Sequence, residues 1–217
     1  MTRHTFEVTD SKLLVDSPII ALRRDQVTMP GGGVASREIV EHFGAVAVVA
    51  LDDDNRIAMV EQYRHSVGKR LWELPAGILD IANEDPTECA RRELHEEAGL
   101  EATEWTLLTD IVTSPGFCEE TVRIFLARGL SQVERPEAQD EEADMEFQWV
   151  PLDEARSAVM DGRINNAIAL AGIMTAAEVV EGRATSRPVE APFELRPESM
   201  AQRRQAQGVV PDMKKVQ

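Results

Sequence analysis

The sequence predicts an α/β fold with a small N-terminal antiparallel sheet region. Three observations predict it: apolar and polar residues alternate over residues 5–42, residues 45–51 are apolar throughout, and residues 86–98 carry the start and stop signals of a helix. The chain has 217 residues, 43% of them hydrophobic, which is enough for one domain of moderate size with appendages.

Residues 1–42 form the first predicted region. Apolar positions such as Phe6, Val8 and Ile19 fall in an alternating pattern, and a Pro-Gly-Gly-Gly run at residues 30–33 interrupts it. Alternation with a glycine-rich break is typical of short antiparallel strands joined by a flexible turn. We expect a small sheet here.

Residues 43–182 form the second predicted region, which opens with a hairpin. Ala45–Leu51 is expected to be a buried strand, residues 52–55 a turn, and Arg56–Tyr63 the returning strand. A further short strand is expected at Leu71–Leu74.

One helix is marked at both of its ends. Asp85 is a suitable N-cap, Pro86 fits the first helical position, and Glu88 completes a capping box three residues after the cap. Gly99 is placed to end the helix in the left-handed conformation. The signals predict a helix over about 86–98.

The remaining elements of the second region follow from apolar runs. We expect strands at Trp105–Val112, Val122–Leu130 and Glu146–Val150, and helices at about 153–160 and 164–181. Residues 183–217 form the third predicted region, where prolines, glutamines and charges dominate without periodicity, and we expect a flexible polar C-terminal tail there.

Charge and cysteine content limit the classes of partner and the compartment. A formal charge of −16 argues against a nucleic-acid groove or an anionic membrane surface, because phosphate neutralisation needs clustered lysines and arginines. The acidic surplus does allow a metal-loaded site for a phosphorylated small molecule. The two cysteines are too few for a disulfide framework, and no apolar run reaches the length of a membrane span. We expect a cytoplasmic protein.

The most informative stretch is residues 92–100. On a helix Glu93 and Glu97 are one turn apart with Glu96 beside them, so like charges are stacked at a cost in stability. A divalent cation would compensate, since carboxylate oxygens suit Mg²⁺ or Mn²⁺. The alternative is an ordinary solvated helix face, with Glu88 and Arg92 as a surface pair.

Gly77, Glu84 and the run 92–100 together resemble the Nudix box, whose usual form is G-x5-E-x7-R-E-U-x-E-E-x-G-U with U a bulky aliphatic residue. The match departs in one place, because six residues instead of five separate Gly77 from Glu84. The resemblance implies the α/β/α sandwich of the Nudix hydrolase superfamily and a pyrophosphate chemistry that depends on metal ions.

The resemblance also implies roles for the residues of the box. Glu93 and Glu97 are expected to bind the metal directly, with Glu96 in the same cluster and the carbonyl of Ala76 as a backbone ligand. Gly77, Glu84 and Arg92 are expected to orient the motif, with Arg92 and Glu84 paired to hold the loop against the helix.

Four further segments are similar to the ADP-ribose pyrophosphatases of this superfamily: residues 62–64, 72–77, 114–117 and 140–145. The resemblance covers roughly residues 40–180. It implies a Mg²⁺-dependent hydrolysis, with Mn²⁺ as an alternative ion, that splits ADP-ribose into AMP and ribose 5-phosphate. It also implies a homodimer to which the N-terminal region contributes across the interface.

Site residues outside the box follow from these segments. Arg64 is expected to supply a cation for the substrate phosphates, Glu73 a hydrogen bond, and Phe117 a packing surface near the substrate. A surface arginine, a solvent-facing carboxylate and a plain loop anchor are the respective alternatives. Glu142 is the preferred general base or extra ligand over its neighbour Glu141, and an exposed acidic loop is the alternative for both.

Two rival functions remain for the sequence. One is a Nudix pyrophosphatase for another nucleoside diphosphate sugar or a dinucleotide. The other is a sensor that binds ADP-ribose without cleaving it; the intact set of Glu93, Glu96 and Glu97 and the lack of a basic DNA-binding appendage count against it.

Overall fold

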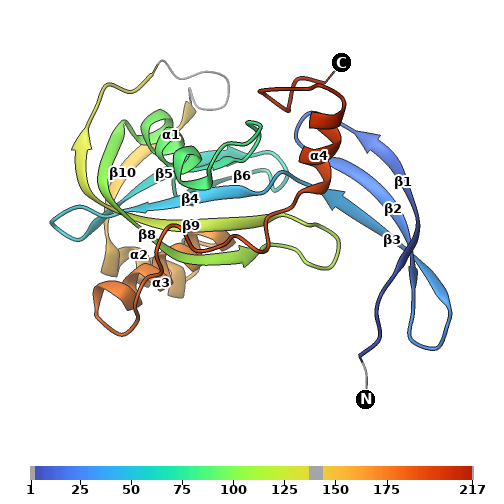
Figure 1. Cartoon of the computed structure of the whole chain (residues 1–217). Coiled ribbons are helices and arrows are strands. Elements are labelled where there is room, and N and C mark those ends of the chain that lie inside the picture. Colours follow the sequence, from blue (N-terminus) through green and yellow to red (C-terminus); the bar gives the residue numbers. More distant parts are fainter. Residues whose placement is uncertain (1–2, 137–143, 217) are drawn as a thin grey trace.

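The computed structural model of the chain describes residues 3–136 and 144–216. In these residues two sheets form the core, with strand orders β7-β4-β9-β8 and β10-β5-β6, and helices cover both sides (Figure 1). The core strands are β4 (Ala45–Ala50), β5 (Arg56–Arg64), β6 (Lys69–Glu73), β7 (Ala76–Ile78), β8 (Leu100–Val112), β9 (Thr121–Gln132) and β10 (Glu146–Pro151).

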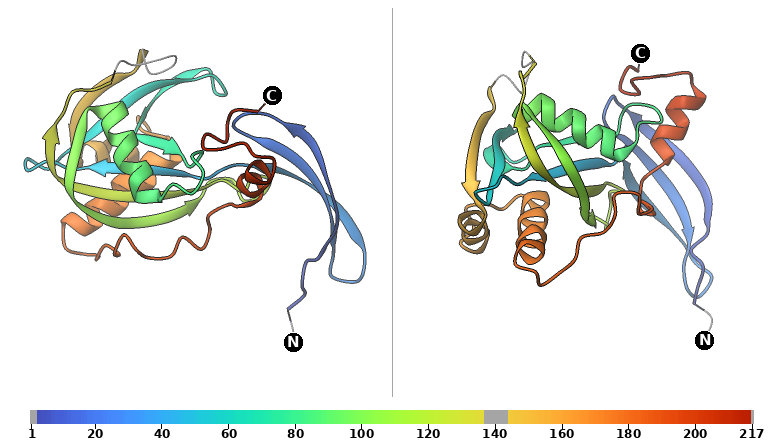
Figure 2. Two further views of the ribbon diagram at one scale, coloured as in Figure 1. Left: turned by 45° about the horizontal axis from the view of Figure 1, so that its top comes forward. Right: turned by 60° about the vertical axis from the view of Figure 1, so that its left-hand side comes forward.

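Strand β4 is buried on both of its faces. It runs parallel to β9 and antiparallel to β7, and all six of its residues are buried. Val46 and Val48 pack with helix α1 (Pro86–Ala98), whereas Val49 on the other face packs with α2 (Leu152–Met160) and α3 (Ala167–Val180). Burial on both faces explains why this strand is a continuous apolar run rather than an alternating one. The α/β/α sandwich implied by the sequence is confirmed, and Figure 2 shows α1 across the sheets from α2 and α3.

Helix α1 begins and ends where the sequence predicts. The Asp85 side chain accepts a hydrogen bond from the Thr87 amide at 2.8 Å, and Gly99 has a φ of 63° in the left-handed region. Strand β7 was not predicted, because three residues are too few for a period of two to be visible. It matters for the site, since it carries Ala76 and Gly77 beside α1.

The N-terminal region forms a separate antiparallel sheet of β1 (Val8–Asp16), β2 (Ala21–Thr28) and β3 (Val34–Glu41). It projects away from the core, and every residue of β1 is exposed (Figure 1). Gly31 and Gly32, with φ of 96° and 87°, form the turn between β2 and β3.

The described part of the C-terminal region, residues 183–216, differs from the flexible tail that its composition predicts. It runs along β8 and β9 and then forms α4 (Ser199–Ala206) beside the N-terminal sheet (Figures 1 and 2). Met200 and Met213 are buried with Phe43. The few apolar residues of this region are therefore used for packing, although they are spaced without a regular period. Among the described residues no helix combines the length and apolar character needed to cross a membrane.

Candidate active site

Helix α1 places two buried glutamates against the backbone of β7. Glu93 is 9% exposed and Glu97 7% exposed. The Ala76 amide donates a hydrogen bond of 2.8 Å to Oε2 of Glu97. A Cβ atom at Gly77 would lie 1.9 Å from Cδ of Glu93, so only a glycine leaves room for this carboxylate.

Arg92 connects the loop before α1 to the acidic residues of the helix. Its Nε and Nη2 donate to the two carboxylate oxygens of Glu84 at 3.0 and 3.1 Å, which is the contact that the sequence predicts. Its Nη1 also donates to Glu93 at 2.6 Å and to Glu96 at 3.0 Å. A bidentate pair of this kind fixes direction as well as charge. Arg92 thereby orients Glu84, Glu93 and Glu96 as one group.

The acidic cluster has the electrostatics of a cation site. Burial raises the pKa of Glu93 to about 7, Arg92 opposes this rise, and the nearby charges of Glu96 and Asp80 add to it. An additional cation would relieve this repulsion. No three acidic, histidine or cysteine side chains in the described part of the chain converge as ready metal ligands, since the Arg92 guanidinium lies among the glutamates. The oxygen donors of Glu93, Glu96 and Glu97 nevertheless fit a hard divalent ion.

A cleft of about 500 Å³ adjoins this cluster. Two predicted substrate residues meet in it: Arg64 donates to both carboxylate oxygens of Glu73, at 2.9 and 2.6 Å. Glu73 is only 4% exposed, so the paired arginine offsets the cost of burying its charge. The cleft is lined by Ile19, His42, Arg64, Ser66, Val67, Leu71, Glu73, Leu74, Ala76, Gly77, Ile78, Glu120, Asn166 and Ile168.

Phe117 does not line this cleft; its side chain is 57% exposed, and its carbonyl accepts a hydrogen bond of 2.7 Å from the amide of Val40. Its packing near the substrate stays a prediction. Glu141 and Glu142 lie outside the described residues.

Sequence reasoning missed four polar residues of the cleft, His42, Ser66, Glu120 and Asn166, of which His42 and Glu120 lie close to each other. His42 is 8% exposed, its Nδ1 accepts from the Gly44 amide at 3.1 Å, and its Nε2 lies 3.7 Å from Oε1 of Glu120. Burial lowers the pKa of His42, although the nearby glutamates oppose this. The available signal was the position of Glu120, which directly precedes strand β9 and follows the 114–117 segment.

An α/β/α sandwich in which the glutamates of a helix pack on a short strand at a glycine is the arrangement of the Nudix hydrolases. The NUDIX domain model matches residues 41–170, and the chain belongs to this family. Family membership implies a divalent metal ion at the acidic cluster.

The chain is similar in sequence to three named proteins. An ADP-ribose pyrophosphatase of Mycobacterium tuberculosis (strain ATCC 25618 / H37Rv) is 53% identical over 204 residues, which cover 94% of this chain and 99% of the relative. An ADP-ribose pyrophosphatase of Bacillus subtilis (strain 168) is 40% identical, covering 69% of this chain and 80% of the relative. A methanol dehydrogenase activator of Bacillus methanolicus is 42% identical, covering 67% and 78%.

A solved structure described as an ADP compounds hydrolase superposes with a TM-score of 0.72 at 18% identity. It covers 85% of this chain, and this chain covers 98% of it. At this identity the likeness shows the fold alone.

Proposed function

We propose that this protein hydrolyses the diphosphate bond of ADP-ribose and releases AMP and ribose 5-phosphate, with Mg²⁺ as the metal ion. One observation carries the proposal: the buried Glu93 and Glu97 of α1 lie on the backbone of Gly77 and Ala76, beside a cleft that also holds Arg64 and Glu73. The substrate is supported by the name of the relative that shares 53% identity over 94% of this chain.

The residues of the chain have distinct tasks in this reaction. Glu93, Glu96 and Glu97 would hold the metal ion, together with the carbonyl of Ala76. When bound, a divalent ion lowers the pKa of an attacking water and neutralises charge on the diphosphate oxygens. Arg92 and Glu84 keep the acidic cluster in position on α1.

Phosphoanhydride hydrolysis asks the protein mainly for positioning and charge stabilisation. Arg64 supplies a fixed cation at the cleft, oriented by its two hydrogen bonds to Glu73. Glu142 accepts the proton of the attacking water, and Glu141 is the alternative acceptor. Both assignments are supported by the resemblance of the 140–145 segment.

A second function in the same class is hydrolysis of another nucleoside diphosphate sugar or of a dinucleotide. The argument in its favour is that metal ions held by the acidic cluster act on the diphosphate, which all of these substrates share. The hypothesis that the protein binds ADP-ribose without cleaving it has less support, because the glutamates of the cluster are all present.

One assay tests these functions. It measures kcat/KM for ADP-ribose, other nucleotide sugars, NADH and dinucleoside polyphosphates with Mg²⁺ and with Mn²⁺, and identifies the products. We expect ADP-ribose among the best substrates, AMP and ribose 5-phosphate as products, and Mg²⁺ to be sufficient. A higher kcat/KM for another diphosphate would assign that compound as the substrate. Tight binding of ADP-ribose without turnover would indicate a sensor.

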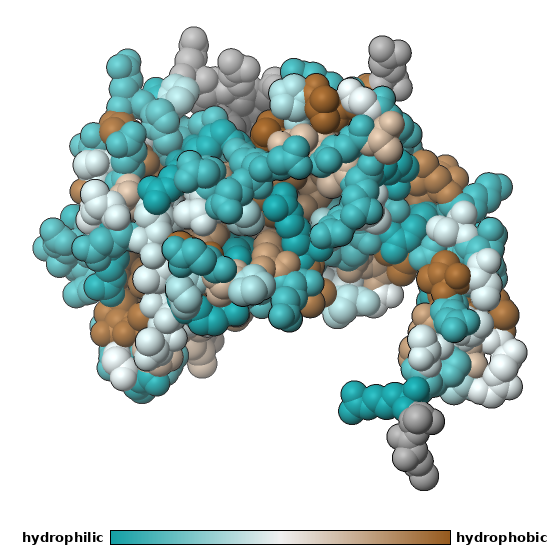
Figure 3. All heavy atoms as spheres, viewed as in Figure 1, coloured by the Kyte–Doolittle hydropathy of each residue, from teal (hydrophilic) through white to brown (hydrophobic). Residues whose placement is uncertain are grey.

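We also propose that the protein is a homodimer whose N-terminal sheets contribute to the interface. The support is a sheet that carries exposed apolar side chains, and Figure 3 shows apolar residues over this part of the surface. These exposed side chains include Val8, Leu13, Leu14, Val15, Ile19 and Val34. Ile19 also lines the cleft, which places the sheet beside the site. Sedimentation equilibrium tests this: we expect a dimer, and a monomer at micromolar concentration would contradict it.

We further infer a cytoplasmic location and a partner that is neither nucleic acid nor membrane. The support is that Cys89 and Cys118 are free thiols, as in a reducing compartment, and that the chain carries a charge of −16.

A further inference from the structure

Residues 196–216, named here the C-terminal strap, lie outside the matched domain of residues 41–170. The strap contains α4 and the segment that follows it. It nevertheless touches both the N-terminal sheet and the loop that precedes α1, as its course in Figure 1 shows. A segment with two such contacts can fix the loop relative to the rest of the molecule.

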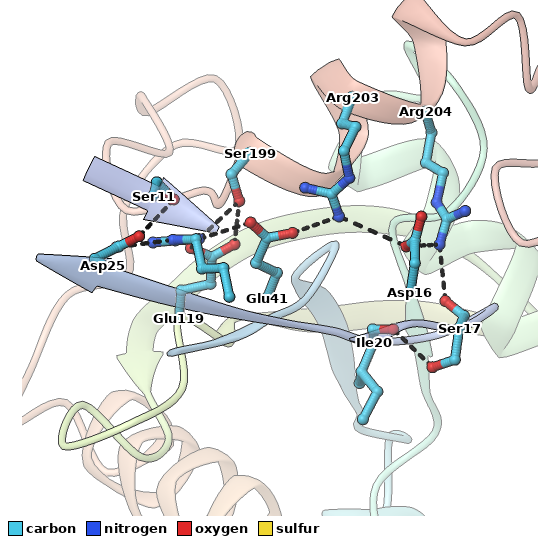
Figure 4. A network of polar contacts seen from close by, with 11 residues as sticks. Ser11, Asp16, Ser17, Ile20, Asp25, Glu41, Glu119, Ser199, Arg203 and Arg204 are labelled. Atoms are coloured by element: carbon cyan, nitrogen blue, oxygen red, sulfur yellow. Dashed lines mark hydrogen bonds and ion pairs between the residues drawn. The ribbon is translucent and has the colours of Figure 1, made fainter. Parts of the chain in front are cut away.

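The first half of the strap is anchored on the N-terminal sheet (Figure 4). Arg204 is 1% exposed and donates to Asp16 at 2.7 Å and to the Ser17 carbonyl at 2.8 Å. Arg203 lies 2.5 Å from Oε2 of Glu41, which is 2% exposed. Buried ion pairs are costly to break, because each would leave an unpaired charge in the interior. The anchor therefore holds the strap in one position.

The second half of the strap pairs with the loop 78–84. The amide of Met213 donates to the Asp80 carbonyl at 2.9 Å, and the amide of Ala82 donates to the Pro211 carbonyl at 2.8 Å. These two bonds flank an antiparallel bridge between Ile81 and Asp212. This loop joins Gly77 to Glu84 and contains the one additional residue by which the chain departs from the usual box. The strap thus provides two of the backbone hydrogen-bond partners of the enlarged loop.

A side-chain ion pair completes this contact beside the acidic cluster. Nζ of Lys214 lies 2.6 Å from Oδ2 of Asp80, which is 3% exposed. Burial would lower the pKa of Lys214, but the hydrogen bond and the charge of Asp80 raise it above its ordinary value, and Glu93 adds to this rise. Asp80 in turn acts on Glu93 through its charge. The pair is therefore within electrostatic reach of a proposed metal ligand.

We propose that Lys214 is a positioning residue for the metal site: by pairing with Asp80 it holds the loop 78–84, and with it Gly77 and Glu84, against helix α1. Without the ammonium group, Asp80 would be a buried carboxylate with no compensating cation, next to an acidic cluster. Such a group takes up a proton or moves toward water, and either change displaces the loop that carries it. This inference rests on the proposed metal-dependent function.

The test compares Lys214→Met, which keeps the length of the side chain and removes its charge, with Lys214→Arg and with the control Lys215→Met. Lys215 is adjacent, but its side chain is 80% exposed and 3.5 Å from Asp212. The readout is the dissociation constant of Mn²⁺ for the substrate-free full-length protein, followed by electron paramagnetic resonance. We expect Lys214→Met to bind Mn²⁺ about tenfold more weakly, the lower end of the effect of outer-shell partners of metal ligands. Lys214→Arg and Lys215→Met should bind it as the wild type does.

The double variant Lys214→Met/Asp80→Asn separates pairing from a general loss of structure. The amide keeps the shape of Asp80 and removes its uncompensated charge, so Mn²⁺ affinity should return to within about twofold of the wild type. Circular dichroism confirms folding in each case. If Lys214→Met does not fold, the double variant carries the test, and weak binding by the folded double variant would overturn the proposal.

Two failures are distinguishable. A wild type that binds no Mn²⁺ would overturn both the proposed function and this inference. A wild type that binds Mn²⁺ and hydrolyses ADP-ribose, beside a folded Lys214→Met variant with the same Mn²⁺ affinity, would overturn this inference alone.

Discussion

The carboxylate of Glu93 lies on the backbone of Gly77, so closely that a Cβ atom at position 77 would be 1.9 Å from both its Cδ and its Oε1. The φ of Gly77 is not among the positive values found in the chain, so its backbone conformation is open to other residues. The requirement for glycine here comes from the approach of the glutamate, which connects two separated positions of the box through one contact.

Gly77→Ala should therefore reduce activity by a steric route. The added methyl group has to displace Glu93, and we expect kcat to fall by about tenfold or more, the scale of one lost transition-state interaction. The control is Gly33→Ala, where an added Cβ would meet no atom within 4 Å and φ is not positive. Steady-state rates with ADP-ribose check this, and a wild-type kcat for Gly77→Ala would contradict the contact.

The proposed metal-ligand roles of Glu93 and Glu97 give a second prediction. Glu93→Gln and Glu97→Gln keep the shape of each side chain and remove a charged oxygen ligand, so turnover should fall by more than about tenfold. Glu88→Gln is a matched control on the same helix, because the Glu88 side chain is 69% exposed. Removal of metal with a chelator should abolish wild-type activity, and Mg²⁺ should restore it. Near-normal rates of either variant at saturating Mg²⁺ would refute the assignment.

The general base is tested by two neighbouring substitutions. Glu142→Gln should lower kcat by about a hundredfold, the low end of what general acid–base catalysis contributes. Glu141→Gln should lower it much less, because the proposal assigns the role of base to Glu142 alone. The pH dependence of kcat should lose its acidic limb only in the variant that lacks the base, because that limb reports protonation of the base. The reverse order of the two rates would move the role to Glu141.

Local signals in the sequence were sufficient for the framework of the site. The limits of α1 follow from Asp85 and Gly99, which act on the backbone within a few residues of themselves. The two-sided burial of β4 follows from its unbroken apolar run. The contact between Arg92 and Glu84 was expected from the resemblance to the Nudix box, in which these two positions are eight residues apart.

Contacts between distant parts of the chain could not be predicted from the sequence. Arg204 and Asp16 are 188 positions apart, and nothing in either segment indicates the other. The charges of the C-terminal region suggested solvation, whereas they are used in ion pairs such as that of Lys214 with Asp80. Composition records that a residue is polar but not whether a partner compensates its burial, which is why the region was expected to be mobile.

The pair of Arg64 and Glu73 leads to a prediction about substrate affinity. If Arg64 contacts the phosphates, Arg64→Gln should raise the KM for ADP-ribose by about tenfold or more, as for a lost hydrogen bond to a charged group. The affinity of the substrate-free protein for Mn²⁺ should stay unchanged. Arg24→Gln is the control, because Arg24 forms an exposed pair with Glu38 on the N-terminal sheet. An unchanged KM would indicate that the Arg64–Glu73 pair has only a structural role.

Gly172→Ala tests the packing of α3 on the sheet. A Cβ atom at position 172 would lie 2.5 Å from Leu74 Cδ1, 3.1 Å from Val49 Cγ2 and 3.3 Å from Ile124 Cγ2. Alanine favours a helix over glycine by about 1 kcal/mol, whereas overpacking a core costs about 1–3 kcal/mol. Leu74 is 2% exposed in a close-packed core, so it has little room to move. The cost of overpacking should therefore exceed the gain in helix propensity. We expect the free energy of unfolding, measured with urea, to fall. A more stable Gly172→Ala variant would mean that α3 can move away from the sheet without loss.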